Sequence, residues 1–163
     1  MITTVKFAKL TPEAIIPQKR TEDLGFDVYA CFKEDNLVIQ PNETKMVYTG
    51  IASACDTDYG FIIKERGSSG IKGLSIRAGV IDSGFRGEWI VLITNVNDKP
   101  IIITKETDVS ALEEDYIVYP YTKAICQAIV IPSPLIDVEE YTYEELLAIG
   151  SERSNGKLGS SGK

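Results

Sequence analysis

The feature that most constrains the fold of this chain is a succession of short apolar runs, each of strand length, separated by residues that favour turns. This pattern, with little apolar spacing of helical period, is typical of all-β sandwiches and jelly-roll barrels. Only residues 69–72 and 143–149 are predicted to form helical turns. We therefore expect strands over 5–10, 25–30, 37–39, 45–52, 59–64, 74–81, 88–94, 101–104 and 121–131.

Composition and charge limit the classes of function. Of 163 residues, 44% are hydrophobic and 25% are charged, which fits one globular domain. No apolar run approaches the roughly 20 residues of a membrane-spanning helix. Residues 1–10 contain no apolar core of the signal-peptide kind, so we expect a cytoplasmic protein. The net charge of −7 argues against nucleic-acid binding, because a phosphate backbone would be repelled.

The chain contains no histidine. This excludes Ser-His and Cys-His catalytic triads and the usual kinds of zinc site. The three cysteines, Cys31, Cys55 and Cys126, lack metal-ligand spacing. We expect them to be reduced and packed as small hydrophobic residues.

The stretch 79–89 carries the clearest candidate for chemistry. It places one carboxylate, Asp82, at a glycine-containing turn between the apolar runs 74–81 and 88–94, a pattern that predicts a β-hairpin. Asp82 has no histidine partner, so as a catalyst it would have to orient and deprotonate water itself. That suits hydrolysis at phosphorus, where positioning and electrostatics supply most of the catalysis. The alternative is an ordinary β-turn, in which Asp and Gly are simply good turn formers.

Other polar residues have two interpretations each. Arg66 and the following Gly-Ser-Ser-Gly could cradle an anion or form a plain loop. Asp27 could hold a divalent cation, directly or through water, or be a surface charge. Gln127 lies in an apolar strand, where it could either contact a bound ligand or be a hydrogen-bonded edge residue. The Gly/Ser-rich tail 150–163 could close over an anion or be a frayed end.

The chain resembles the homotrimeric dUTP pyrophosphatases (dUTPases), because five blocks of the family follow one another in order. In this sequence they are 24–28 (Leu-Gly-Phe-Asp-Val), 66–68 (Arg-Gly-Ser), 79–88 (Gly-Val-Ile-Asp-Ser-Gly-Phe-Arg-Gly-Glu), 122–127 (Thr-Lys-Ala-Ile-Cys-Gln) and 153–162 (Arg-Ser-Asn-Gly-Lys-Leu-Gly-Ser-Ser-Gly). The third block is the most specific, and the fourth is a degraded form of the family's Gly-Asp-Arg-Ile-Ala-Gln. The resemblance implies a distorted jelly-roll barrel, with one or two short helical turns, that forms a homotrimer with shared active sites.

The resemblance implies a reaction and residues for it. Asp82 would activate the water that attacks the α-phosphate of dUTP, giving dUMP and pyrophosphate, which keeps dUTP low and supplies dUMP for thymidylate synthesis. Phe85 would stack against the deoxyribose and exclude a 2′-hydroxyl. Backbone groups near Gly79 and Ile90 would read the uracil.

The triphosphate would be bound by Mg²⁺ and by residues of the second and fourth blocks, namely Arg66, Gly67, Ser68 and Gln127. Asp27 would act on the Mg²⁺ through the waters of the ion. The tail would close over the nucleotide with Arg153, Leu158 and Gly159. We expect one domain over 1–149 and a flexible arm over 150–163.

Three departures from the family pattern are visible. Gly67 replaces the usual serine, so Ser68 or Ser69 would have to supply the hydroxyl. Leu158 replaces the aromatic residue that covers the base. Residues 98–122 are an insertion or extended hairpin, which is a candidate surface for a protein partner and is consistent with a phage or prophage origin.

Two other functions compete with dUTP hydrolysis. A dCTP deaminase shares the fold and a similar hairpin, but that family carries a glutamate where this chain has Leu92. A nucleotide-sensing regulatory protein on the same fold would bind dUTP without turning it over. Turnover of dUTP separates the hydrolase from the sensor, and ammonia release from dCTP identifies the deaminase.

Overall fold

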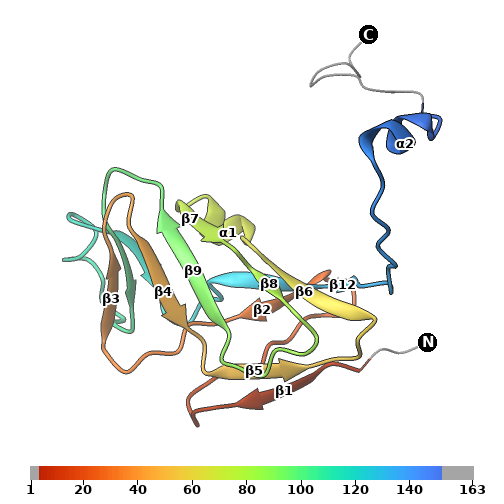
Figure 1. Ribbon diagram of the computed structural model, residues 1–163. Helices are drawn as coiled ribbons and strands as arrows, with labels where there is room; N and C mark the ends of the chain where they lie inside the picture. The colour runs from red at the N-terminus through yellow and green to blue at the C-terminus, as the bar shows by residue number, and fades with distance from the viewer. Residues whose placement is uncertain (1–3, 152–163) are drawn as a thin grey trace.

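The structure is a computed structural model that describes residues 4–151, and its regular structure is almost entirely β (Figure 1). The two helices are short: α1 (Gly67–Gly70) and α2 (Tyr143–Ala148). The strands are β1 (Lys6–Lys9), β2 (Gly25–Val28), β3 (Asn36–Ile39), β4 (Thr44–Tyr48), β5 (Ile51–Ala54), β6 (Tyr59–Lys64), β7 (Leu74–Arg77), β8 (Val80–Ile81), β9 (Ile90–Asn95), β10 (Ile101–Thr104), β11 (Ile117–Pro120) and β12 (Cys126–Pro132). The all-β class and both expected helical turns are confirmed.

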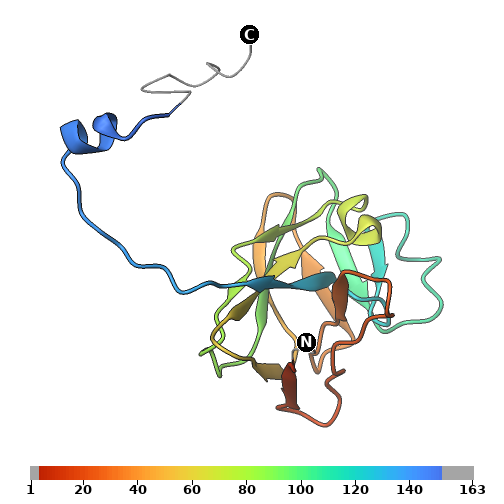
Figure 2. The ribbon, with the colours of Figure 1, turned by 90° about the vertical axis from the view of Figure 1, so that its right-hand side faces the viewer.

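The strands form small sheets that wrap around one core (Figures 1 and 2). Their orders are β1-β5, β11-β10-β3, β2-β12-β6-β8 and β4-β9-β7. The β10–β11 pair is parallel, and the other paired strands are antiparallel. Non-consecutive neighbours such as β2 and β12 bring distant parts of the sequence together.

The core beneath the hairpin is aromatic. Trp89 and Phe61 are both buried, with ring centroids 4.9 Å apart at 67°. Phe7 lies 5.5 Å from Trp89, edge to face. Such pairs contribute about 0.5–1.5 kcal/mol each beyond their buried area. The residue that ends the hairpin loop is thereby fixed in the barrel.

Two expected strands are broken at residues with positive φ. The run 45–52 is divided into β4 and β5 next to Gly50, whose φ is +67°. The run 74–81 is divided at Ala78 (φ 57°) and Gly79 (φ 97°). The expected hairpin therefore consists of β7 and β9, whereas β8 turns away and pairs with β6.

The last barrel strands also differ from those expected. Residues 117–120 form β11, which was not expected. The strand expected over 121–131 begins only at Cys126, because the chain turns after Pro120, whose carbonyl accepts from Lys123 N at 3.0 Å.

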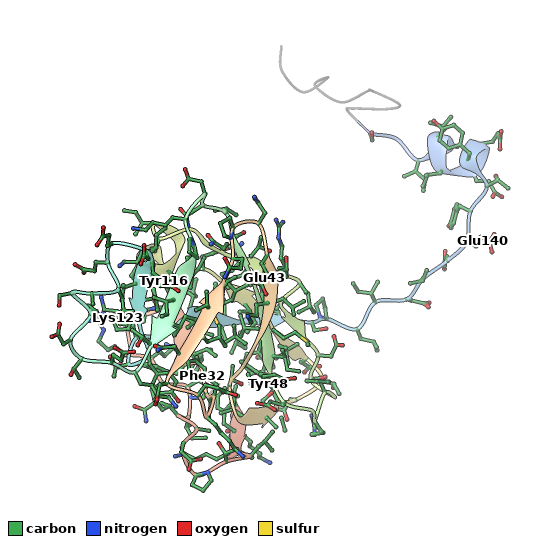
Figure 3. The ribbon with its side chains drawn as sticks, turned by 90° about the vertical axis from the view of Figure 1, so that its left-hand side faces the viewer. Phe32, Glu43, Tyr48, Tyr116, Lys123 and Glu140 are labelled. Carbon is green, nitrogen blue, oxygen red and sulfur yellow. The ribbon has the colours of Figure 1, made fainter. Side chains whose placement is uncertain are left out.

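Residues 133–151 leave the barrel after β12 and are exposed throughout (Figure 2). The view with side chains shows Glu140 well away from the body that carries Phe32 and Tyr48 (Figure 3). Thr142 caps α2, since its hydroxyl accepts from Glu145 N at 3.2 Å. The expected division between a domain over 1–149 and an arm over 150–163 stays a prediction.

Candidate active site

Three of the expected site residues meet on neighbouring strands. Asp27 on β2 lies directly opposite Gln127 on β12, and Gln127 lies opposite Lys64 at the end of β6. The chain leaves β6 at this point and reaches Arg66 two residues later. Asp27, Arg66 and Gln127 line one cavity of about 680 Å³. The sheet therefore assembles the first, second and fourth sequence blocks, and we call this cavity the phosphate half-site.

The charged groups of the phosphate half-site are paired. Arg66 Nε lies 2.9 Å from Asp27 Oδ1, and each side chain is about one-third exposed (32% and 34%). Gln127 Nε2 donates to Glu65 O at 2.8 Å, so the amide fixes the segment that presents Arg66. A Cβ on Gly25 would lie 2.5 Å from Gln127 Oε1, which explains the glycine beside Asp27.

The two serines of the turn after Arg66 lie in different environments. Ser69 is buried, accepts from Arg66 N at 3.0 Å and donates to Arg66 O at 3.1 Å, so its hydroxyl closes the turn. Ser68 is exposed, with its hydroxyl 3.5 Å from Arg66 Nη1. Ser68, rather than Ser69, is thus placed to meet an anion. Gly67 is exposed, with open space where a Cβ would stand.

The hairpin loop forms a second group, which we call the base half-site. Asp82 and Phe85 are exposed on it, and Phe85 N donates to Asp82 O at 3.1 Å. Arg86 Nη1 donates to Ser83 O at 2.6 Å. Glu88 Oε1 accepts from Gly50 N at 2.7 Å. These bonds fix the loop backbone while leaving the Asp82 carboxylate accessible to water.

Two glycines shape the base half-site. Gly79 has a φ of 97°, its carbonyl accepts from Ile63 N at 2.7 Å, and a Cβ there would lie 3.0 Å from Ile63 O. A Cβ on Gly87 would lie 2.6 Å from the Phe85 ring. Gly79 and Ile90 line a small cavity of about 120 Å³. Small-molecule sites usually measure about 300–1,000 Å³, so this cavity alone cannot enclose a nucleotide.

No residue of the described chain lines both cavities. Within the described residues, the two half-sites therefore share no lining residue. Arg153, Leu158 and Gly159 lie outside the described residues.

The structure adds two cations that the sequence analysis missed. Lys19 and Arg20 line the phosphate half-site, and Arg20 Nε lies 2.9 Å from Asp23 Oδ2. The signal was a basic pair shortly before the Asp27 motif.

The candidate metal donor is the single carboxylate of Asp27. Within residues 4–151 no three His, Cys, Asp or Glu side chains gather as a ready metal site. Asp27 is a half-buried carboxylate on the cavity wall beside Arg66. A carboxylate on an open cavity wall is a donor of the kind that suits a hydrated Mg²⁺ ion.

The burial of the cysteines determines how readily their thiols ionise. All three cysteines are free, and Cys126 is buried, which raises the pKa of its thiol well above the usual range. Cys31 and Cys55 are half-buried. The reduced state and small-hydrophobe packing predicted for Cys126 agree with this environment.

Fold and half-sites together place the chain among β-barrel phosphohydrolases that act on nucleotides. A family model described as dUTPase matches residues 11–112. The deoxyuridine 5'-triphosphate nucleotidohydrolase of Nautilia profundicola is 31% identical over 163 residues, covering 98% of this chain and 99% of that protein. The chain belongs to the dUTPase family, and its enzyme class is that of the dUTP diphosphatases.

Solved structures support the same fold. The dUTPase of Staphylococcus bacteriophage 80alpha, solved with dUpNHpp, has a TM-score of 0.69 at 23% identity and covers 98% of this chain and 99% of its own. The dUTPase of phage phi11 of S. aureus, whose structure describes a structural Mg(II) ion, has a TM-score of 0.66 at 18% identity, with coverages of 85% and 96%. The predicted family and jelly-roll fold are confirmed. No helix in the described part of the chain has the length and apolarity to cross a membrane.

Proposed function

We propose that this chain hydrolyses dUTP to dUMP and pyrophosphate, with Asp82 as the general base. The observation that carries the proposal is the Asp82 carboxylate, exposed on a loop that is held before it by the Ile63–Gly79 bond and after it by the Arg86–Ser83 and Gly50–Glu88 bonds. Asp82 takes a proton from water, whose oxygen attacks the α-phosphorus. The bond from that phosphorus to the bridging oxygen breaks, and pyrophosphate leaves with the bonding electrons.

The substrate spans both half-sites in this proposal. Phe85, which is 43% exposed, packs against the deoxyribose, and backbone groups near Gly79 and Ile90 bind the uracil. Arg66, the turn at Gly67 and the Ser68 hydroxyl bind the phosphates, and Gln127 orients the Arg66 segment. Bound Mg²⁺ would neutralise phosphate charge, with Asp27 holding its water shell. The tail residues Arg153, Leu158 and Gly159 would cover the nucleotide.

We propose a homotrimer in which each active site combines half-sites of different subunits. The absence of a lining residue common to the two half-sites in the described chain supports this. So does an apolar outer face on the β4-β9-β7 sheet, where Met46 pairs with Leu92 and Tyr48 with Ile90. Met46 is 55% and Tyr48 44% exposed, an arrangement typical of a face that a second subunit covers.

Several narrower expectations remain predictions. Removal of dUTP and supply of dUMP for thymidylate synthesis follow from the reaction. The cytoplasmic location, the phage or prophage origin and a protein partner at residues 98–122 rest on the sequence alone. The deaminase stays disfavoured, because Leu92 is a half-buried apolar residue of β9.

The test is pyrophosphate release from dUTP, dTTP, dCTP and UTP with Mg²⁺. We expect turnover of dUTP alone. Asp82→Asn should lower the rate by about 10²–10⁴-fold, with nucleotide binding largely retained. The control Asp56→Asn, in an exposed turn, should leave the rate unchanged. Comparable rates on UTP would contradict the role of Phe85. Binding without turnover by the wild type would favour the sensor, and ammonia release from dCTP would favour the deaminase.

A further inference from the structure

The phosphate half-site contains a second pair of an arginine and an aspartate, in the loop that precedes the first of the five sequence blocks. Arg20 Nε lies 2.9 Å from Asp23 Oδ2, and Arg20 Nη2 donates to Asp23 Oδ1 at 3.0 Å. Both residues line the same cavity as Arg66 and Asp27. The cavity wall therefore carries two guanidinium groups, each bound to a carboxylate.

The loop backbone holds Arg20 at the edge of the half-site. Asp27 N donates to Gln18 O at 2.8 Å, in a bridge that joins the start of the loop to β2. Lys19 Nζ closes the loop by donating to Asp23 O at 2.7 Å and to Arg20 O at 3.3 Å. The backbone of Arg20 is thus fixed, whereas its side chain is 87% exposed and can turn toward a ligand.

The chemistry of the Arg20 pair suits an exchange of partners. Arg20 presents Nε and Nη2 to Asp23 as a bidentate donor, which is also the geometry in which a guanidinium binds a phosphate. Exposed ion pairs are weak because water screens their charges. A phosphate, which carries more negative charge than a carboxylate, can therefore replace Asp23 as the partner of Arg20.

The charge balance of the cavity makes such an exchange favourable for an anion. Its lining contains three cations and three carboxylates: Lys19, Arg20, Arg66, Glu22, Asp23 and Asp27. A lining without net charge attracts a polyphosphate only where a cation leaves its carboxylate for the ligand. Release of Arg20 from Asp23 would add a second guanidinium to the one supplied by Arg66.

We propose that Arg20 is a second phosphate-binding arginine, which exchanges Asp23 for the outer phosphates and so favours triphosphate over monophosphate. The inference rests on the proposed function, because it assigns Arg20 to the triphosphate of that substrate. It deepens that function by adding a binding residue from outside the five blocks, and by making Asp23 the group that competes with the ligand.

The first test compares ligands with and without the outer phosphates at a fixed Mg²⁺ concentration. Arg20→Gln keeps a polar side chain and removes the charge. Binding of dUpNHpp should weaken about tenfold, the range for a lost hydrogen bond between charged groups, while binding of dUMP should change less than about twofold. Lys33→Gln is the matched control: it makes the same change in net charge at an exposed residue outside this cavity, and should leave both affinities unchanged.

Asp23→Asn gives an independent measurement of opposite sign. It frees Arg20, so binding of dUpNHpp should tighten about two- to fivefold, the range for an exposed ion pair. In the Arg20→Gln background the same change should lose most of this gain, because the two residues act as one pair.

Three results would overturn the inference: unchanged dUpNHpp affinity in Arg20→Gln, equal losses for dUpNHpp and dUMP, or an equal gain from Asp23→Asn in both backgrounds. Failure of the wild type to release pyrophosphate from dUTP, with dUpNHpp binding still dependent on Arg20, would instead overturn the proposed function.

Discussion

Arg66 and Asp27 form an ion pair, with Arg66 Nε 2.9 Å from Asp27 Oδ1. The first is the expected phosphate cation and the second the expected partner of Mg²⁺. A Mg²⁺-triphosphate offers each of them an opposite charge, so binding can replace one ion pair by two.

Asp27→Asn separates these roles. Without the carboxylate, Arg66 is free for phosphate, so the variant should bind dUpNHpp without Mg²⁺ more tightly than the wild type does. The Mg²⁺ concentration for half-maximal turnover should rise several-fold, because the loss of one charge-assisted contact costs about 1 kcal/mol. Titrations of binding and rate against Mg²⁺ check both. Asp56→Asn, which removes an exposed carboxylate outside this cavity, should change neither.

Gly67→Ser tests the departure in the second sequence block. The position has open space for a Cβ, so the serine should fold without strain and add a hydroxyl beside Ser68. We expect dUpNHpp affinity to rise by about 0.5–1.5 kcal/mol, the usual net value of one hydrogen bond. Gly70→Ser, where a Cβ meets only Glu65 Cβ at 3.7 Å, is the control at the end of the same turn. Weaker binding by Gly67→Ser would show that the glycine itself is needed.

Gly79→Ala should be strained by its φ of 97° and by the 3.0 Å approach to Ile63 O. The expected loss is about 1–3 kcal/mol of unfolding free energy, with weaker uracil binding because the β7–β8 break would shift. Gly84→Ala, in the same hairpin loop with nothing within 4 Å of a Cβ, should melt like the wild type. The measurement is thermal melting of both variants. Equal melting temperatures for Gly79→Ala and Gly84→Ala would contradict the strain expected at Gly79.

Glu65 makes stability depend on pH. Burial raises the pKa of its carboxyl, but hydrogen bonds from Ile76 N and its own N–H, together with Lys64, outweigh burial and hold the pKa below the ordinary 4.5. The folded state therefore favours the carboxylate, and this stability is present above pH 4.5 and is lost as the pH falls below it. Glu65→Gln should cost about 1 kcal/mol at neutral pH, with the two melting curves converging in acid. A difference in melting temperature between wild type and Glu65→Gln that stayed constant across pH would exclude the Glu65 carboxylate as the source of the pH dependence.

Local patterns located the turns that carry the candidate site residues better than they located the strand boundaries, and the roles of those residues stay predictions. Asp82, Phe85 and Arg66 were recognisable because turn chemistry and sequence blocks are local. The breaks at Gly50 and Ala78 were not, since an apolar run continues through a residue of positive φ without a change in composition. The meeting of Asp27 with Gln127 was not recognisable either, because it depends on the pairing of β2 with β12, which lie far apart in the sequence. Long-range pairing decides which local signals become one site.

Complementation between two inactive variants tests the shared site. Arg66→Ala damages the phosphate half-site, and Asp82→Asn damages the base half-site. When equal amounts are unfolded and refolded together, random trimers should regain about one-quarter of the wild-type activity, since each intact site needs one undamaged half from each variant. Asp82→Asn mixed with Phe85→Ala should stay inactive, because both changes affect the same half-site. A site contained within one chain would give no recovery in either mixture, and recovery in both would mean that the hairpin residues come from different subunits.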